Sequence, residues 1–430
     1  MIKKINAVHG MHDYIFPDTL LWQYVEDTIK SILNSYGYKE IKLPILEKSE
    51  LFKKNIGENT DIIEKEMYNL CDRNGDNLTL RPEGTTGFIR AIVEHNLFYN
   101  KNKRFWYNGP MFRYERPQKG RYRQFNQIGI EVLGFESPYI DIEIIIITYN
   151  LWKKLNIIKN IFLEINSIGS LTDRKKYIKE LIFFLKKNIN SLDENCKKKI
   201  YTNPLRILDS KNKIVQQLLN KAPKLQNYLN DNSIKKFKEL CKILSFMNIN
   251  FVVNNNLVRG LDYYNDIVFE WKTNKIGSHK TICGGGRYDL LIKVMSNNKD
   301  INGIGCAIGL ERLLLLIQNK QSIKIETEYF IDIYIAPLLK NKYIIQKIFF
   351  IGELIRKNFP LLRIVTSYVF KNLNKQIIQA VKQKARFILI IGQYEIMNNL
   401  IIIKDLHLKK QMIFSEQELI FKLKKIFKKY

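Results

Sequence analysis

The chain has 430 residues, 46% of them hydrophobic, and its 70 lysines and arginines outnumber its 42 aspartates and glutamates to give a formal net charge of +28. This length predicts two or three domains, and the hydrophobic fraction is ample for a packed core. No aliphatic run approaches the roughly 18 residues of a membrane-spanning helix, and the N-terminus has no apolar stretch typical of a secretory signal, so we expect a cytoplasmic protein.

The positive charge has two interpretations. It would attract a polyanion and speed its association, or it reflects a drift of the whole composition toward lysine, isoleucine and asparagine. The arginines are more informative, because four of them (Arg113, Arg116, Arg121 and Arg123) fall close together in a lysine-rich chain. Such a cluster indicates sites that need a planar guanidinium to bind two acceptor atoms at once.

Metal ligands and disulfides are not indicated. The five cysteines have no C-x-x-C spacing, which argues against both a zinc site and a disulfide framework. His9 and His12 have the spacing of a ligand pair, but no further cluster completes the four ligands that zinc prefers. We therefore expect no resident metal.

The N-terminal half predicts helices attached to an antiparallel sheet. Residues 18–36 predict an amphipathic helix with Asp18 as N-cap, Gly37 as stop, and a buried face of Leu21, Tyr24, Val25, Thr28, Ile29 and Ile32. Residues 38–46 follow as an edge or interface strand, because Pro44 cannot donate to a sheet ladder. Strands over 78–85, 104–115 and 124–134 enclose a short helix that ends near His95.

The second half changes character twice. Residues from about 170 to 248 are lysine-rich and helix-periodic, which predicts a helical insertion into a sheet domain that resumes with strands over 250–253 and 266–271. Beyond the polar stretch 321–329, strands over 331–337, 361–369, 386–392 and 399–405 alternate with helices over 342–357 and 374–384. The sequence thus predicts an α+β fold with domains 1–325 and 330–430, the second a small α/β domain.

Polar residues on one strand face predict a ligand pocket. Side chains alternate along a strand, so Gln127, Gly129 and Glu131 of "FNQIGIEV" share one face. Glu83 and Thr85 of "RPEGT" alternate in the same way, and so do Arg113 and Glu115 of "MFRYE". Carboxylates that bind an ammonium group, beside arginine that binds a carboxylate or phosphate, are what an amino-acid and nucleotide pocket requires. The alternative is a solvent-exposed sheet face.

Three further motifs place charges or glycines inside apolar stretches. "LVRGLDYY" at 257–264 places Arg259 and Asp262 where an unpaired charge would cost several kcal/mol. The two form an ion pair, or the segment is a solvated edge, or Arg259 has a partner from outside the chain. "CGGGRYD" at 283–289 lets backbone approach a ligand closely, and "GIGCAIGLERLLLLI" at 303–317 lacks the βαβ unit of a dinucleotide-binding fold.

Together these segments resemble the three signature motifs of class II aminoacyl-tRNA synthetases, and "LVRGLDYY" with "CGGGRYD" resembles the histidyl-tRNA synthetase family in particular. "GMHDY", "TLRPEGT", "GPMFRYERPQKGRYRQF", "QIGIEVLG", "TNPLRILDSKN" and "GLERL" extend the resemblance over essentially the whole chain. It implies a six-stranded antiparallel catalytic sheet, a helical insertion facing the tRNA, a C-terminal anticodon-binding domain and a homodimer to which Pro44 contributes. The reaction that the resemblance implies joins L-histidine to tRNA through histidyl-adenylate, consuming ATP with its Mg²⁺ and releasing AMP and diphosphate. The resemblance implies no membrane or DNA partner.

The resemblance also implies roles for individual residues. Histidine would be bound through its α-amino group by Glu83, Thr85 and Gln127, and through its imidazole by Glu131 and Tyr264, with Tyr263 lining the same pocket. Arg113 and Arg259 would act on the phosphate and on the histidine carboxylate side. Arg259 would occupy the place where other class II enzymes bind a metal ion. Glu115 would lie near the adenine, Arg312 would contact the nucleotide, and Arg116 and Gln118 would meet the tRNA acceptor end.

The chain departs from the family pattern at a few positions and leaves two rival functions to weigh. Tyr114, Asn126 and His9 replace the usual residues, and "SYVFKNLNKQ" stands where the last domain should be glycine-rich. One rival is the regulatory relative from histidine biosynthesis, which would lack the C-terminal domain and usually Arg259. The other is a synthetase-like sensor of uncharged tRNA, which degraded pocket residues would indicate. The motifs favour the synthetase.

Overall fold

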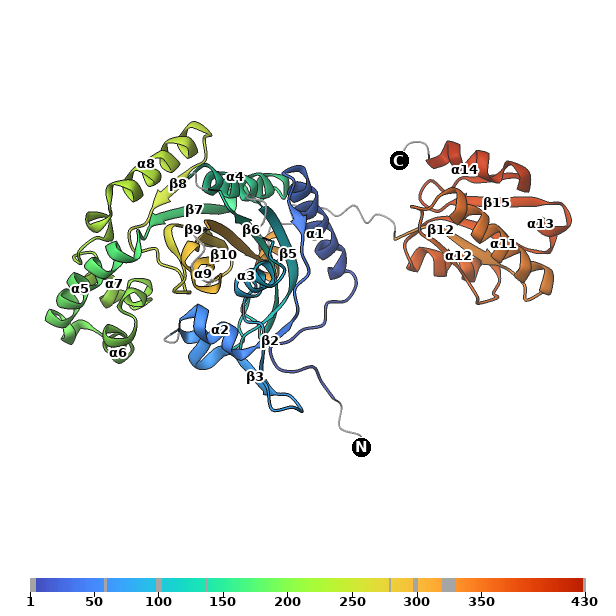
Figure 1. Cartoon of the computed structure of the whole chain (residues 1–430). Helices are drawn as coiled ribbons and strands as arrows, with labels where there is room; N and C mark the ends of the chain where they lie inside the picture. The colour runs from blue at the N-terminus through green and yellow to red at the C-terminus, as the bar shows by residue number, and fades with distance from the viewer. Residues whose placement is uncertain are drawn as a thin grey trace. The chain divides into compact units, whose positions relative to one another are not determined.

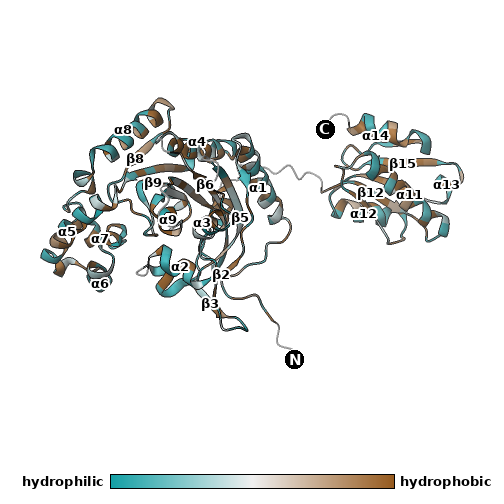
Figure 2. Ribbon diagram, in the orientation of Figure 1, coloured by the Kyte–Doolittle hydropathy of each residue, from teal (hydrophilic) through white to brown (hydrophobic). Residues whose placement is uncertain are grey.

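The computed structural model describes residues 5–57, 60–97, 103–135, 138–277, 280–296, 301–318 and 330–427. The chain divides into two compact units, Met1–Ile323 and Lys324–Tyr430 (Figure 1). Hydrophobic residues follow the strands of each unit, whereas the helices carry both polar and apolar sides (Figure 2). Within the described ranges, no helix is both long and apolar enough to cross a membrane.

The first unit is built on an eight-stranded sheet with the order β1-β5-β6-β11-β10-β9-β7-β8. Its strands are β1 Lys39–Glu40, β5 Lys103–Phe112, β6 Gln124–Leu133, β7 Ile161–Ser167, β8 Phe251–Val253, β9 Asn265–Thr273, β10 Thr281–Arg287 and β11 Gly303–Gly309. The strands from β5 to β7 in this order pair antiparallel. The six-stranded antiparallel sheet that the resemblance implies is therefore present. Two short edge strands widen it: β1 pairs in parallel with β5, and β8 pairs in parallel with β7.

Helices cover both faces of this sheet. They are α1 Asp18–Ser35, α2 Ser49–Ile56, α3 Thr85–Glu94, α4 Pro138–Lys154, α9 Asp289–Met295 and α10 Leu310–Gln318. On one face, Trp271 Nε1 of β9 donates to Thr148 Oγ1 of α4 at 2.8 Å. On the other face, Thr85 Oγ1 at the start of α3 donates to Glu131 Oε1 of β6 at 2.9 Å. The second face is the one that carries the polar residues singled out in the sequence.

Helix α1 forms over the predicted residues and ends at Ser35, and Gly37 follows the C-cap residue Tyr36 with a φ of 75°, in the left-handed region that glycine favours. Its buried face contains five of the six predicted residues and Leu33. Tyr24 was wrongly placed there, because its side chain is exposed. Asp18 is the first helical residue rather than the N-cap, which is Pro17.

The strands predicted over 38–46 and 78–85 are shorter in the structure, and part of this region forms a second, three-stranded sheet. It contains β2 Leu46–Lys48, β3 Tyr68–Cys71 and β4 Asn77–Leu80. Pro44 lies between β1 and β2 in no strand, and β4 ends at Leu80, so Glu83 and Thr85 do not alternate on a strand as predicted. The buried Arg81 explains the break, because its guanidinium donates to the carbonyl oxygens of Leu43 at 3.0 Å and Pro110 at 2.9 Å.

Residues 171–246 form the helical insertion between β7 and β8. Its helices are α5 Leu171–Lys187, α6 Glu194–Thr202, α7 Lys213–Leu219 and α8 Asp231–Phe246. Leu181, Ile200, Val215 and other insertion residues share one hydrophobic cluster with Phe88 and Tyr107 of the sheet domain. Helices α5 to α7 are therefore packed onto the face of the sheet that carries Glu131, whereas α8 packs against α4.

The second unit is a five-stranded sheet, β13-β12-β14-β15-β16, with helices on both faces. Its elements are β12 Ile331–Pro337, α11 Lys342–Asn358, β13 Ile364–Thr366, α12 Leu373–Lys382, β14 Ala385–Ile391, α13 Gln393–Met397, β15 Leu400–Asp405, β16 Gln411–Ser415 and α14 Leu419–Phe427. Ile333 of β12 packs in a cluster with α11 and α14, whereas its neighbour Tyr334 packs in another with α12. Alternation along a strand thus feeds two cores.

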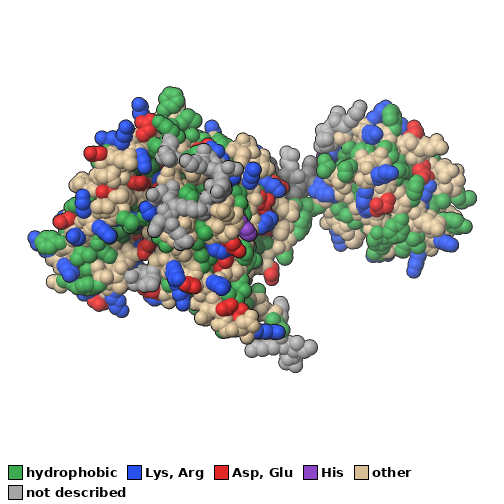
Figure 3. Space-filling view, in the orientation of Figure 1, with side chains coloured by type: hydrophobic (Ala, Val, Ile, Leu, Met, Phe, Trp, Pro, Cys, Tyr) green, Lys and Arg blue, Asp and Glu red, His purple; other side chains and the backbone are tan. Residues whose placement is uncertain are grey.

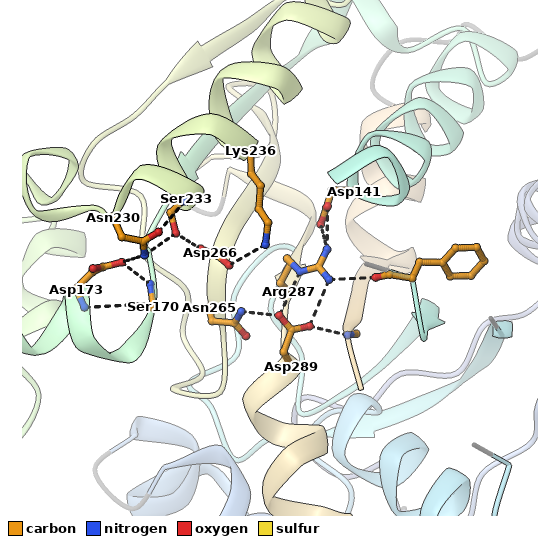
Figure 4. A network of polar contacts seen from close by, with 12 residues as sticks. Asp141, Ser170, Asp173, Asn230, Ser233, Lys236, Asn265, Asp266, Arg287 and Asp289 are labelled. Carbon is orange, nitrogen blue, oxygen red and sulfur yellow. Dashed lines mark hydrogen bonds and ion pairs between the residues drawn. The ribbon is translucent and has the colours of Figure 1, made fainter. Parts of the chain in front are cut away.

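A buried ion pair joins α4 to the sheet (Figure 4). Arg287 Nη1 at the end of β10 donates to both carboxylate oxygens of Asp141, at 3.0 and 2.9 Å, and the two side chains are 3% and 1% exposed. Arg287 also contacts Asp289, which in turn accepts from Asn265 Nδ2 of β9 at 2.8 Å. Removing one member of such a pair leaves an uncompensated buried charge.

We expect Arg287→Leu to lower the free energy of unfolding of the first unit by about 3–5 kcal/mol. The variant would leave Asp141 buried without its cation. Urea denaturation followed by tryptophan fluorescence measures this unit alone, because all four tryptophans (Trp22, Trp106, Trp152 and Trp271) lie in it. Lys197→Ala, which breaks an exposed pair with Glu194, is the control and should change little. A loss equal to the control would contradict a stabilising role.

Candidate active site

The pocket has a buried carboxylate at its centre. Glu131 of β6 is 1% exposed, and its Oε1 accepts hydrogen bonds from Thr85 Oγ1 at 2.9 Å and Tyr107 Oη at 3.2 Å. Its Oε2 accepts from Tyr288 Oη at 2.7 Å. Burial raises the pKa of Glu131 to about 8, although these hydrogen bonds act in the opposite direction. The predicted solvent-exposed alternative for this strand face is therefore wrong.

Glu83 provides a second carboxylate beside it. Its two oxygens accept from the backbone amides of Thr85 at 2.7 Å and Thr86 at 2.9 Å, so it caps the N-terminus of α3. Tyr263 Oη donates to Glu83 Oε2 at 3.4 Å. Glu83 and Thr85 thus reach the pocket from a helix start, and not from the strand that the sequence predicted.

Glycines make room for these side chains. A Cβ at Gly129 or at Gly84 would overlap the ring of Tyr107, which lies between the two. A Cβ at Gly305 would overlap the carboxylate of Glu131, and one at Gly284 would overlap the guanidinium of Arg259. The gap that the sequence shows at position 129 is therefore filled by an aromatic ring from the neighbouring strand β5.

Four arginines line an adjoining cavity of about 270 Å³, and three of them are predicted site residues. Arg113, Arg259 and Arg312 border it together with Glu115 and Gln127, so five of the predicted site residues come together in one place. Burial, followed by the charges of Arg113 and Arg121, lowers the pKa of Arg312 to about 10. Guanidinium groups gathered in a partly desolvated cavity repel one another, and a bound anion with several oxygens would relieve that repulsion.

Arg259 has a partner within the chain that was not among those expected from the sequence. Its Nη1 forms an ion pair with Glu270 of β9, and its guanidinium carbon lies 5.5 Å from the centre of the Tyr264 ring. Asp262 is not its partner, because that carboxylate accepts from Asn203. Arg259 Nε is buried without a hydrogen-bond partner among the described residues. The guanidinium is therefore anchored at one nitrogen and retains donors for a ligand.

Arg113 and Arg312 are held by backbone carbonyls. Arg113 Nε donates to Pro82 O at 2.9 Å, and its guanidinium carbon lies 5.2 Å from the centre of the Phe125 ring. Arg312 Nε and Nη1 donate to Gly120 O at 2.8 Å and Thr281 O at 2.9 Å. Neutral partners fix both groups without cancelling their charge.

The loop between β5 and β6 divides into a cavity side and a solvent side. Glu115 lines the cavity and pairs with Arg121. Arg116 and Gln118 are exposed and do not line the cavity. Gln118 and Arg121 pair their backbone amides and carbonyls at 3.1 and 2.8 Å, which forms a tight turn at the loop tip. Arg116 and Gln118 are therefore accessible to a large partner.

Sequence reasoning missed Tyr107, Tyr288, Glu270 and Glu311. Glu270 could have been found, because it shares one strand face with Val268 and Lys272 and is an acidic residue on that face. Tyr288 lies in the quoted motif "CGGGRYD". Glu311 accepts from the backbone amide of Asn126 at 2.8 Å and so ties α10 to β6. Tyr107 could not be found without the register that places it opposite Gly129.

Comparisons with known proteins agree over the whole chain. A sequence model of the family described as histidyl-tRNA synthetase matches residues 10–313. Histidine–tRNA ligase of Buchnera aphidicola subsp. Schizaphis graminum is 52% identical over 431 residues, with 100% of this chain and 99% of that protein covered. The corresponding ligase of Blochmanniella pennsylvanica is 49% identical over 425 residues, covering 99% and 96%.

Solved structures give the same fold. Apo histidyl-tRNA synthetase of S. aureus superimposes with a TM-score of 0.79 at 30% identity, covering 97% of this chain and 99% of that one. A Bacillus halodurans protein described as ATP phosphoribosyltransferase regulatory subunit/histidyl-tRNA synthetase gives a TM-score of 0.62 at 18% identity, covering 91% and 98%. The latter likeness shows the fold alone, so the regulatory alternative gains no support from it. The predicted class II fold is confirmed.

The raised pKa of Glu131 predicts an unusual dependence of stability on pH. An unfolded glutamate loses its proton near about pH 4.3, whereas the folded pKa is about 8. Between these values the folded state binds one proton more than the unfolded state. The contribution of Glu131 to the free energy of unfolding is therefore fully present below the lower pKa and is lost as pH rises toward the higher one. Glu131→Gln cannot titrate, and it should lose less unfolding free energy between about pH 5 and pH 8, by on the order of 3 kcal/mol.

Urea denaturation of both proteins at several pH values, followed by tryptophan fluorescence, measures this difference. Glu94→Gln, on the exposed side of α3, is the matched control and should follow the wild-type pH dependence. Parallel curves for the wild type and Glu131→Gln would show that Glu131 titrates at its ordinary pKa.

Proposed function

The chain belongs to the histidyl-tRNA synthetase family, and from this membership we propose that it joins L-histidine to its cognate tRNA by way of histidyl-adenylate. It is an ATP-dependent ligase that releases AMP and diphosphate. The observation that carries the proposal is the convergence of Arg113, Arg259 and Arg312 on one cavity, beside the buried carboxylates of Glu83 and Glu131.

We assign histidine to the inner part of the pocket. Glu83, Thr85 and Gln127 would bind its α-amino group, since two carboxyl or hydroxyl oxygens and an amide oxygen suit an ammonium ion. Glu131 and Tyr264 would bind the imidazole, with Tyr263 as a wall. Among the described residues, Glu131 Oε2 accepts one hydrogen bond, from Tyr288, and therefore has a lone pair for an imidazole N–H. Ligand donation favours the ionised carboxylate.

ATP would occupy the arginine-lined cavity. A histidine carboxylate oxygen attacks the α-phosphorus, the bond from that phosphorus to the oxygen bridging the β-phosphate breaks, and diphosphate leaves. Negative charge grows on the nonbridging oxygens, where Arg113 and Arg259 would donate to it from fixed positions. Arg312 would contact the remaining phosphates, and Glu115 would lie near the adenine.

Magnesium would arrive with ATP. Three carboxylates border the cavity, and each has other partners. Glu115 pairs with Arg121 and Glu270 with Arg259, while Glu311 accepts from the backbone amide of Asn126. In the part of the chain that the structure describes, no group of three acidic, histidine or cysteine side chains is arranged to hold a metal ion. Phosphate oxygens would therefore supply most of the Mg²⁺ ligands, and the ion would neutralise phosphate charge.

The tRNA would be bound at separate places on the chain. Arg116 and Gln118 on the exposed loop would meet the acceptor end, the insertion would face the tRNA, and the second unit would be the anticodon-binding domain. Homodimerisation through the region of Pro44 and a cytoplasmic location belong to the same proposal. Large partners of this kind need accessible positive charge, which the loop provides.

Histidine-dependent exchange between ATP and labelled diphosphate tests the proposal, and we expect Arg259→Lys to reduce it by roughly a hundredfold. Lysine preserves a cation opposite Glu270 but loses the planar two-point donor. The melting temperature should therefore change little. Arg104→Lys, which alters a partly buried pair with Glu143 outside the cavity, is the matched control and should retain wild-type exchange.

Two outcomes would count against the proposal. A wild-type chain without histidine-dependent exchange would contradict the ligase function itself. An Arg259→Lys variant with full exchange and a lowered melting temperature would show that Arg259 acts as a structural partner of Glu270 only.

The net charge predicts different salt dependence for the two half-reactions. Figure 3 shows lysine and arginine side chains spread over the drawn face of both units rather than gathered in one patch. We expect the affinity for tRNA to fall at least tenfold between about 50 and 200 mM salt, because many counterions are released, while diphosphate exchange changes less than about threefold. Filter binding and exchange assays in the same buffers measure both, and equal losses would favour compositional drift as the origin of the charge.

A further inference from the structure

Residues 262–266, which we name the tyrosine segment, carry Tyr263 and Tyr264 into the pocket. Tyr263 Oη donates to Glu83 Oε2 at 3.4 Å. The centres of the two tyrosine rings are 4.7 Å apart, and the guanidinium carbon of Arg259 is 5.5 Å from the Tyr264 ring. The proposed function assigns both rings to the wall of the histidine pocket, and the backbone position of this segment would then determine the shape of that pocket.

Both acidic ends of the tyrosine segment accept hydrogen bonds from the insertion. Asn203 directly follows α6. At one end of the segment, its Nδ2 donates to the two carboxylate oxygens of Asp262 at 3.0 and 3.2 Å. At the other end, Ser233 Oγ of α8 donates to Asp266 Oδ1 at 2.6 Å, and Lys236 Nζ lies 4.0 Å from Asp266 Oδ2 (Figure 4). The two tyrosines therefore lie between two contacts with the insertion.

The backbone of the segment requires such support. Asp266 has a φ of 47°, in the left-handed region that few residues other than glycine adopt. It lies in a β-bulge, because Gly286 pairs with Val268 while Arg287 pairs with Asn265. An unfavourable backbone conformation persists where surrounding contacts hold it.

A buried arginine of the insertion adds to this arrangement. Arg174 of α5 is 8% exposed, and its Nε and Nη2 lack hydrogen-bond partners among the described residues. Its positive charge interacts with Asp262 and Asp266, the same two acidic residues. Four side chains of the insertion thus act on the ends of one segment.

We infer that the helical insertion positions the histidine pocket, with Asn203 and Ser233 as positioning residues that hold the tyrosine segment at its two ends. The inference rests on the proposed function, since it assigns the pocket to histidine. Any displacement of α6 or α8, such as RNA bound to the insertion would cause, would then be transmitted to the wall formed by Tyr263 and Tyr264.

The test compares the Michaelis constants for histidine and ATP in diphosphate exchange. Asn203→Ala and Ser233→Ala should each raise the KM for histidine roughly threefold to tenfold, the equivalent of one hydrogen bond, and leave the KM for ATP within about twofold. Ser233→Ala spares the cap of α8, because Asn230 Oδ1 accepts from the backbone amide of residue 233. Ser233→Thr, which keeps the hydroxyl, should restore the KM for histidine.

Matched controls change similar side chains elsewhere in the insertion. Asn188 donates to Phe184 O at 2.8 Å, away from the tyrosine segment, and Ser245 is exposed near the end of α8. Asn188→Ala and Ser245→Ala should keep both wild-type KM values. The inference is overturned if the Asn203→Ala/Ser233→Ala double variant keeps the wild-type KM for histidine, or if both KM values rise together with a lower melting temperature. Absence of exchange in the wild type would instead reject the proposed function, before any variant is made.

Discussion

The buried carboxylate of Glu131 is the interaction on which the pocket depends. Its hydrogen bonds bring together α3 through Thr85, β5 through Tyr107, and the end of β10 through Tyr288. These donors come from segments far apart in sequence, so the carboxylate acts as a common acceptor that fixes their spacing. Burying it without them would cost several kcal/mol. The surrounding glycines follow from this choice, because only they leave room for the acceptor and its donors.

The arginine-lined cavity differs from the surroundings of Glu131, because its charged groups are not fully compensated by partners within the described part of the chain. Arg113 and Arg312 are oriented by carbonyl oxygens and Arg259 by the carboxylate of Glu270, so these three groups are not neutralised by one acid each. The cavity therefore retains excess positive charge in a partly buried place, at a cost in stability. An anionic ligand recovers that cost on binding, which is how a preorganised electrostatic site favours charge that develops during a reaction.

Local patterns predicted the sequence of helices and strands well, because period and punctuation suffice for elements such as α1, β5 and β6. They failed where tertiary contacts decide. Arg81 draws the chain out of strand geometry near Pro44, and Glu83 becomes a helix cap instead of a strand residue. The pocket residues named from the sequence came mostly from the resemblance to a family. Tyr107 and the partner of Arg259 stayed hidden, because both depend on which strands are neighbours.

The position of Tyr107 between Gly84 and Gly129 has a consequence for how this pocket can evolve. The ring occupies the volume that two missing side chains would fill, so the three positions form a single steric unit. A larger residue at either glycine is compatible only with a smaller one at 107, while a smaller residue at 107 alone leaves a void beside Glu131. Each single step passes through a less stable intermediate, and the effects of the steps are non-additive. Lineages that change the size of this pocket would therefore have to change these positions together.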